Sequence, residues 1–251
     1  HGNMSHSTND VMPSALRISA VRMIDKLLST LDVLILALEK KAKEFAHIKK
    51  LGRTHLQDAV PITLGQEFSA YAQYLKRGEH RIKYARESML ELNLGGSAVG
   101  NSINVSPKYM VKLYQQLKHI TGLPFRPTKH LMAGTSSNSD FVALSQSLTA
   151  LCVDLSKIAN DLRLLSSGPK GGFGEIVLPA LAPGSSIMPG KVNPILPEAI
   201  NQLYFLVSGN NLTIEHAAEA AQLELGVMLP VVTDRLLESL KLMNELLSVF
   251  T

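Results

Sequence analysis

Apolar side chains recur at alternating steps of three and four residues over three long windows of the chain, 20–48, 64–92 and 141–165. A repeat that averages 3.5 residues and continues for about four heptads is typical of long helices packed at small angles. At 1.5 Å per residue, each such helix is roughly 40–50 Å long. Two further helical patterns cover about 194–224 and 231–250, and no window alternates with period two. The pattern predicts an all-α fold, a long up-down helical bundle.

Four polar or Gly/Pro-rich segments separate the predicted helices: 1–13, 50–61, 93–107 and 167–194. Loops longer than about 12–15 residues are uncommon inside compact domains and are often functional. The last segment is therefore the first place to look for chemistry. With no internal repeat and no low-complexity tract, we expect one helical-bundle domain over residues 1–251.

Composition narrows the class of protein. Hydrophobic residues make up 45% of the 251 positions and charged residues 18%, which excludes intrinsic disorder and falls short of a membrane protein. The net charge is +4, but the basic residues are interspersed with acidic ones, and there is no Trp. We therefore expect neither a nucleic-acid nor a membrane partner. The single cysteine, Cys152, cannot form an internal disulfide, and the start of the chain does not resemble a signal peptide, so we expect a cytoplasmic location.

The segment Gly184-Ser-Ser-Ile-Met-Pro-Gly-Lys-Val-Asn-Pro194 combines hydroxyl, ammonium and amide groups on a loop framed by glycine and proline. It is not a nucleotide-binding P-loop, because five residues separate Gly184 from Gly190 and Val192 stands where Ser or Thr would bind magnesium. Lysine and asparagine donors in a mobile loop could stabilise an oxyanion. A flexible surface loop has the same composition, and from the residues alone both interpretations stay open.

This loop resembles the signature Gly-Ser-Ser-x-Met-Pro-x-Lys-x-Asn of the fumarase/aspartase superfamily. Other segments, in the right order along the chain, are similar to further conserved regions of that family: Ser5-His-Ser-Thr-Asn-Asp10, Gly52-Arg-Thr-His-Leu-Gln-Asp-Ala-Val-Pro61, Leu64-Gly-Gln-Glu-Phe68, Leu94-Gly-Gly-Ser-Ala-Val-Gly100 and Leu165-Ser-Ser-Gly-Pro169. The resemblance covers the whole chain.

The resemblance implies a β-elimination in which a proton beside a carboxylate is removed and an amine or hydroxyl then leaves, giving fumarate. Deprotonation creates a dianionic enediolate, which needs preorganised cations and hydrogen-bond donors. Ser185 matches the general base of the family, and Lys191 and Asn193 match the residues that stabilise the enediolate. His55 and Glu198 match a His–carboxylate pair that could supply a proton or fix the substrate.

The remaining matched residues would hold the carboxylates of the substrate. They are Ser7, Thr8, Asn9 and Thr54, together with Asn193. Ser-Thr-Asn-Asp is also a common helix N-cap sequence, and a helix N-terminus is itself an anion site, so the two interpretations are compatible. A lone histidine such as His55 is more often a structural group than a catalytic one. No metal-ligand spacing is present, and the family needs no cofactor for this reaction.

Within the superfamily, the chain is more similar to the aspartase branch. Pro194-Ile-Leu-Pro-Glu-Ala-Ile-Asn-Gln202 and Ala217-Ala-Glu-Ala-Ala-Gln-Leu-Glu-Leu225 resemble aspartase segments, and Asn3-Met-Ser5 leans the same way. The resemblance therefore favours a carbon-nitrogen lyase that removes ammonia from L-aspartate, with hydration of fumarate to L-malate as the alternative. Two positions depart from the family: His6 replaces a usual Gln, and Gly226 replaces a usual Asn.

The family also has domains on either side of its helical core, and we expect the 251 residues to be the central domain without them. In the family, long helices from four subunits form a common core and each active site draws residues from several chains. The resemblance thus implies a homotetramer with shared active sites and a small dicarboxylate substrate. The competing hypothesis is an inactive helical domain whose role is assembly alone.

Overall fold

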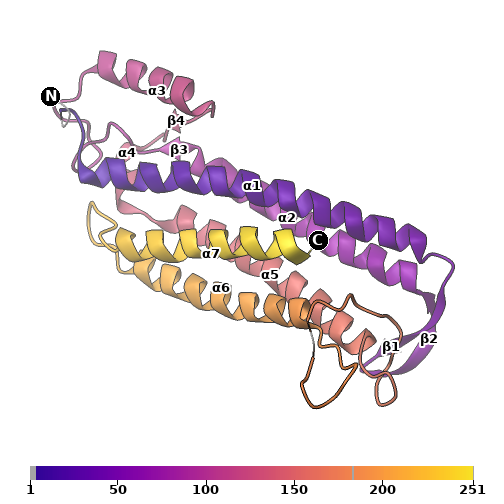
Figure 1. Ribbon diagram of the computed structural model, residues 1–251. Helices are drawn as coiled ribbons and strands as arrows, with labels where there is room; N and C mark the ends of the chain where they lie inside the picture. Colours follow the sequence, from indigo (N-terminus) through magenta and orange to yellow (C-terminus); the bar gives the residue numbers. More distant parts are fainter. Residues whose placement is uncertain (1–3, 183, 251) are drawn as a thin grey trace. The chain divides into compact units, whose positions relative to one another are not determined.

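The structure, a computed structural model, describes residues 4–182 and 184–250. This part of the chain contains seven helices and four short strands (Figure 1). The helices are α1 (Thr8–Glu44), α2 (Leu64–Met89), α3 (Pro107–Thr121), α4 (Leu131–Ser136), α5 (Ser139–Leu165), α6 (Ile195–Glu219) and α7 (Leu229–Phe250). The strands are β1 (Lys49–Thr54), β2 (Gln57–Thr63), β3 (Glu91–Leu92) and β4 (Arg126–Pro127). The all-α helical bundle expected from the sequence is confirmed.

The chain forms two compact units, and α1, α2, α5, α6 and α7 each contribute a segment to both. The first unit comprises the residues up to Leu27, Arg81–Leu148 and Ser208–Lys241. The second unit comprises Leu28–His80, Thr149–Val207 and the residues from Leu242 onwards. The expectation of one domain over the whole chain stays a prediction.

In the first unit, the predicted apolar positions form the core: Ile24, Ile82 and Leu144 are fully buried. A buried arginine joins three helices there. Arg17 on α1 donates to the carbonyl of Ser88 and to the carboxylate of Asp140, both at 2.9 Å. Because a buried charge is costly unless it is paired and hydrogen-bonded, these contacts fix how α1, α2 and α5 meet in this unit.

In the second unit, Leu31, Leu75 and Leu151 are fully buried on α1, α2 and α5. The buried amide of Asn201 on α6 donates to the hydroxyl of Ser156 on α5 at 2.8 Å. Helix α5 is long and apolar enough to cross a membrane by composition, but half of its most apolar 18-residue window is buried within the protein. That burial is what the core helix of a bundle requires.

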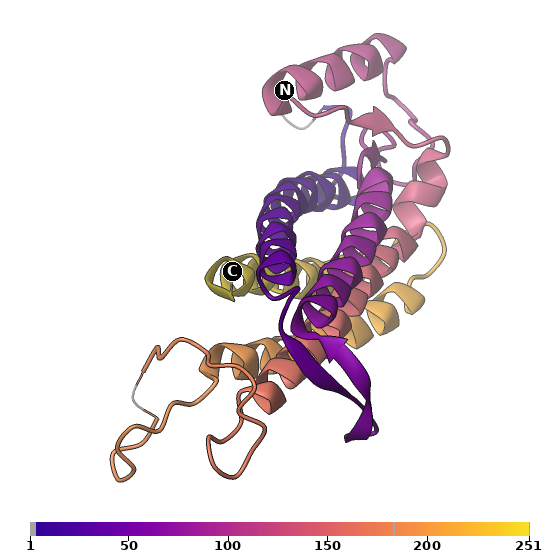
Figure 2. The same ribbon diagram turned by 90° about the vertical axis from the view of Figure 1, so that its right-hand side faces the viewer.

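The segment 50–61, expected as a loop, instead lies within an antiparallel hairpin of β1 and β2 (Figure 2). No alternating pattern marks this segment because the hairpin has no buried face: Gly52 is the one buried residue in β1, and β2 is exposed from Gln57 to Pro61. A second correction concerns the start of the chain. Helix α1 begins at Thr8 and contains Pro13, so the polar segment expected over 1–13 is shorter than its composition indicated.

Candidate active site

Ser7 and Asp10 form a capping box at the amino end of α1. The Ser7 hydroxyl accepts the backbone N–H of Asn9 at 3.2 Å, and the Asp10 carboxylate accepts the backbone N–H of Ser7 at 2.8 Å. This reciprocal pattern satisfies two donors that a helix start leaves open. The N-cap interpretation of Ser-Thr-Asn-Asp is therefore confirmed, and it leaves the Thr8 side chain exposed.

Asp10 also holds a loop from much later in the chain. Its carboxylate is fully buried and accepts the backbone N–H groups of Gly95 and Ser97, each at 2.9 Å. The Asn9 amide donates to the carbonyl of Ala98 at 2.8 Å. The loop 94–98 is thereby fastened to the residues predicted to bind a carboxylate. Sequence reasoning missed this positioning role of Asp10, because nothing local in the sequence links it to a segment 85 residues away.

Thr8 and Asn9 open onto a concavity of about 290 Å³ in the first unit, whose other walls include Met12, Asn138 and Gly226. The space beside Gly226 is taken by a side chain. A Cβ atom there would lie 2.4 Å from the amide nitrogen of Asn138, whose side chain is buried. Position 226 departs from the family pattern because it lacks a side chain, and the amide of Asn138 occupies the space that such a side chain would need.

Thr54 and His55 lie at the exposed tip of the β1–β2 hairpin. Thr54 pairs with Gln57, so that His55 and Leu56 form a two-residue turn, and their φ angles are 57° and 61°. Positive φ at both central residues is the requirement of a type I′ turn, which favours Asn-Gly. The left-handed conformation costs roughly 1–2 kcal/mol at each residue that has a Cβ. The backbone is thus strained at His55, a residue predicted to belong to the active site.

The signature loop is folded back on itself. The backbone N–H of Gly184 donates to the carbonyl of Lys191 at 2.9 Å, and the Asn193 amide donates to the carbonyl of Gly184 at 3.1 Å. A Cβ atom at residue 184 would lie 2.4 Å from the Lys191 carbonyl oxygen, so only glycine allows this closure. Asn193 therefore shapes the loop, in addition to any role toward a substrate.

Ser185 and Lys191 line one open concavity of about 480 Å³ within this loop. The Ser185 hydroxyl oxygen accepts the backbone N–H of Ile187 at 3.2 Å, which is one of the donors that an ionised serine would need. The Lys191 side chain is exposed, and no hydrogen bond or ion pair engages its ammonium among the residues that the structure describes. Ser185 and Lys191 thus share a surface that water reaches.

Glu198 is exposed in the first turn of α6, where the helix dipole favours a carboxylate. Its side chain accepts a hydrogen bond from Gln202 at 3.2 Å. Over residues 4–182 and 184–250, no hydrogen bond connects Glu198 with His55. The pairing of these two residues stays a prediction, as do the catalytic roles of all the candidate residues.

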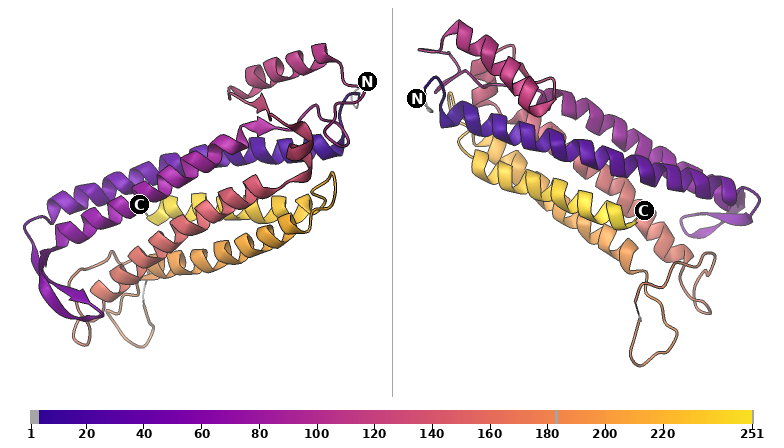
Figure 3. Two further views of the ribbon diagram at one scale, coloured as in Figure 1. Left: turned by 180° about the vertical axis from the view of Figure 1, so that it is seen from behind. Right: turned by 45° about the horizontal axis from the view of Figure 1, so that its top comes forward.

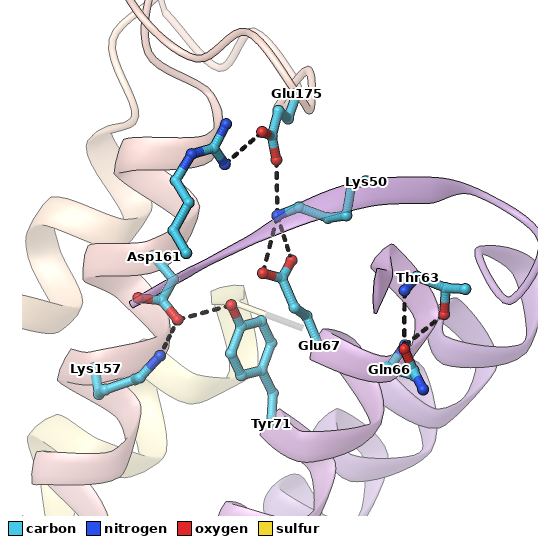
Figure 4. A network of polar contacts seen from close by, with 9 residues as sticks. Lys50, Thr63, Gln66, Glu67, Tyr71, Lys157, Asp161 and Glu175 are labelled. Carbon is cyan, nitrogen blue, oxygen red and sulfur yellow. Dashed lines mark hydrogen bonds and ion pairs between the residues drawn. The ribbon is translucent and has the colours of Figure 1, made fainter. Parts of the chain in front are cut away.

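A network of charged residues along β1 includes Glu175, which sequence reasoning did not single out (Figure 4). Glu175, on the segment after α5, lies 2.6 Å from Arg53 and 2.7 Å from Lys50. Burial raises the carboxyl pKa of Glu175, but the hydrogen bonds from Lys50 and Arg53 lower it more, so the pKa falls below its ordinary value. Their spacing in the sequence could not predict this network, because Arg53 and Glu175 are 122 positions apart.

A second part of the same network joins α2 to α5. The Tyr71 hydroxyl donates to Asp161 at 2.8 Å, and Lys157 also pairs with Asp161. Burial, together with the neighbouring Asp161 charge, raises the pKa of Tyr71, so the tyrosine remains a neutral donor. In the described part of the chain, no group of three or more His, Cys, Asp or Glu side chains could hold a metal ion.

The signature loop and helices α1 to α5 lie within the residues that match one protein-family model. The chain matches the family described as "Lyase" over residues 1–209, and it belongs to that family. Among its relatives, the aspartate ammonia-lyase of Bacillus subtilis (strain 168) is 49% identical over all 251 residues, which are 53% of that protein. The aspartate ammonia-lyase of Escherichia coli (strain K12) is 46% identical over 98% of this chain and 51% of that protein. The chain spans about half the length of these curated relatives.

Solved structures show the same fold. The class II fumarase from Schistosoma mansoni matches with a TM-score of 0.96 and 36% identity, over 100% of this chain and 56% of that one. The structure described as fumarate lyase:delta crystallin from Brucella melitensis bound to cobalt matches with a TM-score of 0.95 and 47% identity, over 98% of this chain and 54% of that one. Fold similarity therefore extends to a relative named as a fumarase.

Proposed function

We propose that the full-length protein is an aspartate ammonia-lyase that converts L-aspartate to fumarate and ammonia. The observation that carries the proposal is the Gly184–Pro194 loop, in which a serine and an exposed lysine line one concavity. Relatives named aspartate ammonia-lyase at 46–50% identity over nearly the whole chain support the choice of substrate.

In the proposed reaction, ionised Ser185 takes a proton from the carbon next to the side-chain carboxylate of aspartate. The electron pair moves into that carboxylate, giving an enediolate whose negative charge Lys191 and Asn193 stabilise. The pair then returns to form the carbon–carbon double bond, and the carbon–nitrogen bond breaks as ammonia leaves. Thr54, with Ser7, Thr8 and Asn9, would bind the carboxylates, and His55 with Glu198 would fix the substrate or supply a proton.

Comparing Ser185→Ala with Ser186→Ala in the full-length protein tests the assignment of the base. Fumarate has strong ultraviolet absorbance, so its formation from L-aspartate can be followed directly. Because loss of a general base lowers turnover by about 10²–10⁴-fold, Ser185→Ala should be nearly inactive. Ser186→Ala changes a neighbouring exposed hydroxyl and should keep most of the activity. Equal activity in the two variants would reject Ser185 as the base.

Fumarate hydratase is the second candidate, because the class II fumarase structure superimposes on the full chain. The two reactions share every step up to the enediolate and differ in the leaving group, ammonia or water. Incubation with L-aspartate and, separately, with L-malate distinguishes them. Fumarate from malate alone would reject the aspartase proposal in favour of this alternative.

We also propose that the protein is a homotetramer that shares its active sites between chains, in a reducing cytoplasmic compartment. In the second unit, large apolar side chains point to solvent from α1 and α6: Val33 and Leu36 are 55% and 63% exposed, and Phe205 is 64% exposed. Such surfaces are typical of subunit contacts. The buried free thiol of Cys152 is compatible with a reducing compartment. Analytical ultracentrifugation tests the assembly: a monomer would contradict it, and a tetramer without turnover would favour an assembly-only domain.

A further inference from the structure

The hairpin that carries Thr54 and His55 has little of its own to hold it in place. Its second strand is exposed from Gln57 to Pro61, and its turn places His55 and Leu56 at positive φ. A strained turn persists only where surrounding structure over-determines it. Contacts outside the hairpin must therefore stabilise this backbone conformation.

Those contacts converge on Arg53, the residue directly before Thr54. Its guanidinium Nη1 lies 2.6 Å from Glu175 Oε1, and its Cζ lies 4.4 Å from the centre of the Phe173 ring. Phe173 and Glu175 belong to one short segment after α5, so a carboxylate and an aromatic ring hold the same guanidinium. The two views of Figure 3 both place this segment beside the hairpin.

Glu175 uses its other oxygen on a second residue of the same strand. Lys50 Nζ lies 2.7 Å from Glu175 Oε2 and also 2.8 Å from Glu67 in the first turn of α2. The Lys50 side chain is only 8% exposed, so its ammonium is largely shielded from water between the two carboxylates. The backbone N–H of Glu175 in turn donates to the Leu165 carbonyl at 2.8 Å, which ties the carboxylate to the end of α5. Figure 4 shows Glu175 above Lys50, with Glu67 on the other side of the ammonium.

We propose that Glu175 is a positioning residue that clamps β1 through Arg53 and Lys50 and thereby keeps the His55–Leu56 turn in its left-handed conformation. Glu175 does not touch the substrate. It acts through Arg53, one residue from Thr54 and two from His55, so loosening the clamp lets the turn relax and removes both side chains from their working positions. This inference rests on the proposed lyase reaction for its effect on turnover, but not for its effect on the hairpin backbone.

The test compares Glu175→Gln with Glu39→Gln in the full-length protein. Both variants replace one carboxylate of an ion pair in the second unit, since Glu39 pairs with Lys76 between α1 and α2, but within the described residues no hydrogen bond or ion pair links Glu39 to the hairpin. For Glu175→Gln we expect hydrogen exchange at the Thr54 and Gln57 amides to accelerate about tenfold, equivalent to about 1.4 kcal/mol of local opening. The value of kcat/KM for L-aspartate should fall by a similar factor, and exchange in α2 and α5 should not change. Glu39→Gln should leave the hairpin amides and turnover as they are.

Leu56→Gly provides a rescue that a purely structural ion pair would not show. Glycine adopts positive φ without strain, so position 56 no longer depends on the clamp, whereas His55 keeps its positive φ of 57°. Adding Leu56→Gly to Glu175→Gln should therefore restore part of the lost exchange protection and part of kcat/KM. If Glu175→Gln does not fold, Arg53→Lys replaces it, because lysine keeps the charge but loses the planar contact with Phe173, and the same local acceleration is expected.

Unchanged exchange at the hairpin amides in Glu175→Gln, or equal acceleration throughout α2 and α5, would overturn the clamp. Failure of the proposed function has a different signature: the unmodified protein would release no fumarate from L-aspartate, while Glu175→Gln still accelerated exchange at the hairpin. Accelerated local exchange in an active protein that keeps full kcat/KM would overturn the link from the clamp to catalysis.

Discussion

Replacing Asp10 by asparagine exchanges one carboxylate oxygen for an NH₂ group and should strongly destabilise the first unit. One carboxylate oxygen accepts the Ser7 N–H, and the other accepts those of Gly95 and Ser97. An amide can keep its oxygen on Gly95 and Ser97 but then turns its NH₂ group toward the N–H of Ser7. One bond to a charged acceptor, worth about 1.5–3 kcal/mol, is lost, and two more weaken by about 1 kcal/mol each, so we expect a loss of about 3.5–5 kcal/mol.

Urea unfolding followed by circular dichroism, at fixed protein concentration, measures this loss. Asp25→Asn is the matched control, since it replaces an acidic residue of the same helix and unit whose side chain is 42% exposed and pairs with Arg86. Its pair with Arg86 is bidentate and the arginine is only 17% exposed, so the control loses more than the about 0–1 kcal/mol of a surface pair, but water reaches the half-exposed carboxylate and the loss should be clearly smaller than for Asp10→Asn. If the two variants lost the same stability, the reasoning that a buried carboxylate organises this end of α1 would be refuted.

Three further predictions follow from other buried groups. Gly226→Ala should lower the free energy of unfolding by about 1–3 kcal/mol through overpacking against Asn138, and adding Asn138→Ala should recover part of that loss in a double-mutant cycle by urea unfolding. Burial raises the pKa of the Cys152 thiol to about 12, so iodoacetamide at pH 8 should label it only after denaturation, as read by mass spectrometry; labelling of the native protein would contradict this. Because the Glu175 pKa is lowered in the folded protein, its stabilisation is full above the pKa of the unfolded chain and is lost as pH falls through the folded pKa. The stability gap between the unmodified protein and Glu175→Gln should therefore be largest near neutral pH and shrink in acid, and a gap independent of pH would contradict the cited contacts.

The long helices were predictable because burial repeats along them. Ile24, Leu75 and Leu148 lie on seams that remain fully buried, and a buried stripe is what the 3.5-residue period records. The hairpin and α3 were not predictable by the same signal. Helix α3 has no buried residue, and β2 exposes both of its faces from Gln57 to Pro61, so neither segment needed an apolar pattern to form.

Some residues of the candidate site could likewise be predicted from the sequence, and others could not. Ser185 and Lys191 could be singled out because they lie in one short segment with a specific motif, and the structure places them on one concavity. Asp10 and Glu175 could not, since their partners lie 85 to 122 positions away and any of the many acidic residues could have made those contacts. A local motif can therefore identify candidate catalytic residues. The residues that position them can be identified only once the contacts between distant segments are known.

The hydrogen bonds of Asp10 also bear on how this protein is made. A helix can form within microseconds of leaving the ribosome, but synthesis proceeds at about 5–20 residues per second. The last partner of Asp10, Ser97, is 87 positions downstream. The amino end of α1 therefore waits, on the order of several seconds, with a carboxylate that has no final partners. During that interval a chaperone or a trailing segment of the nascent chain has its best opportunity to bind this end of the helix.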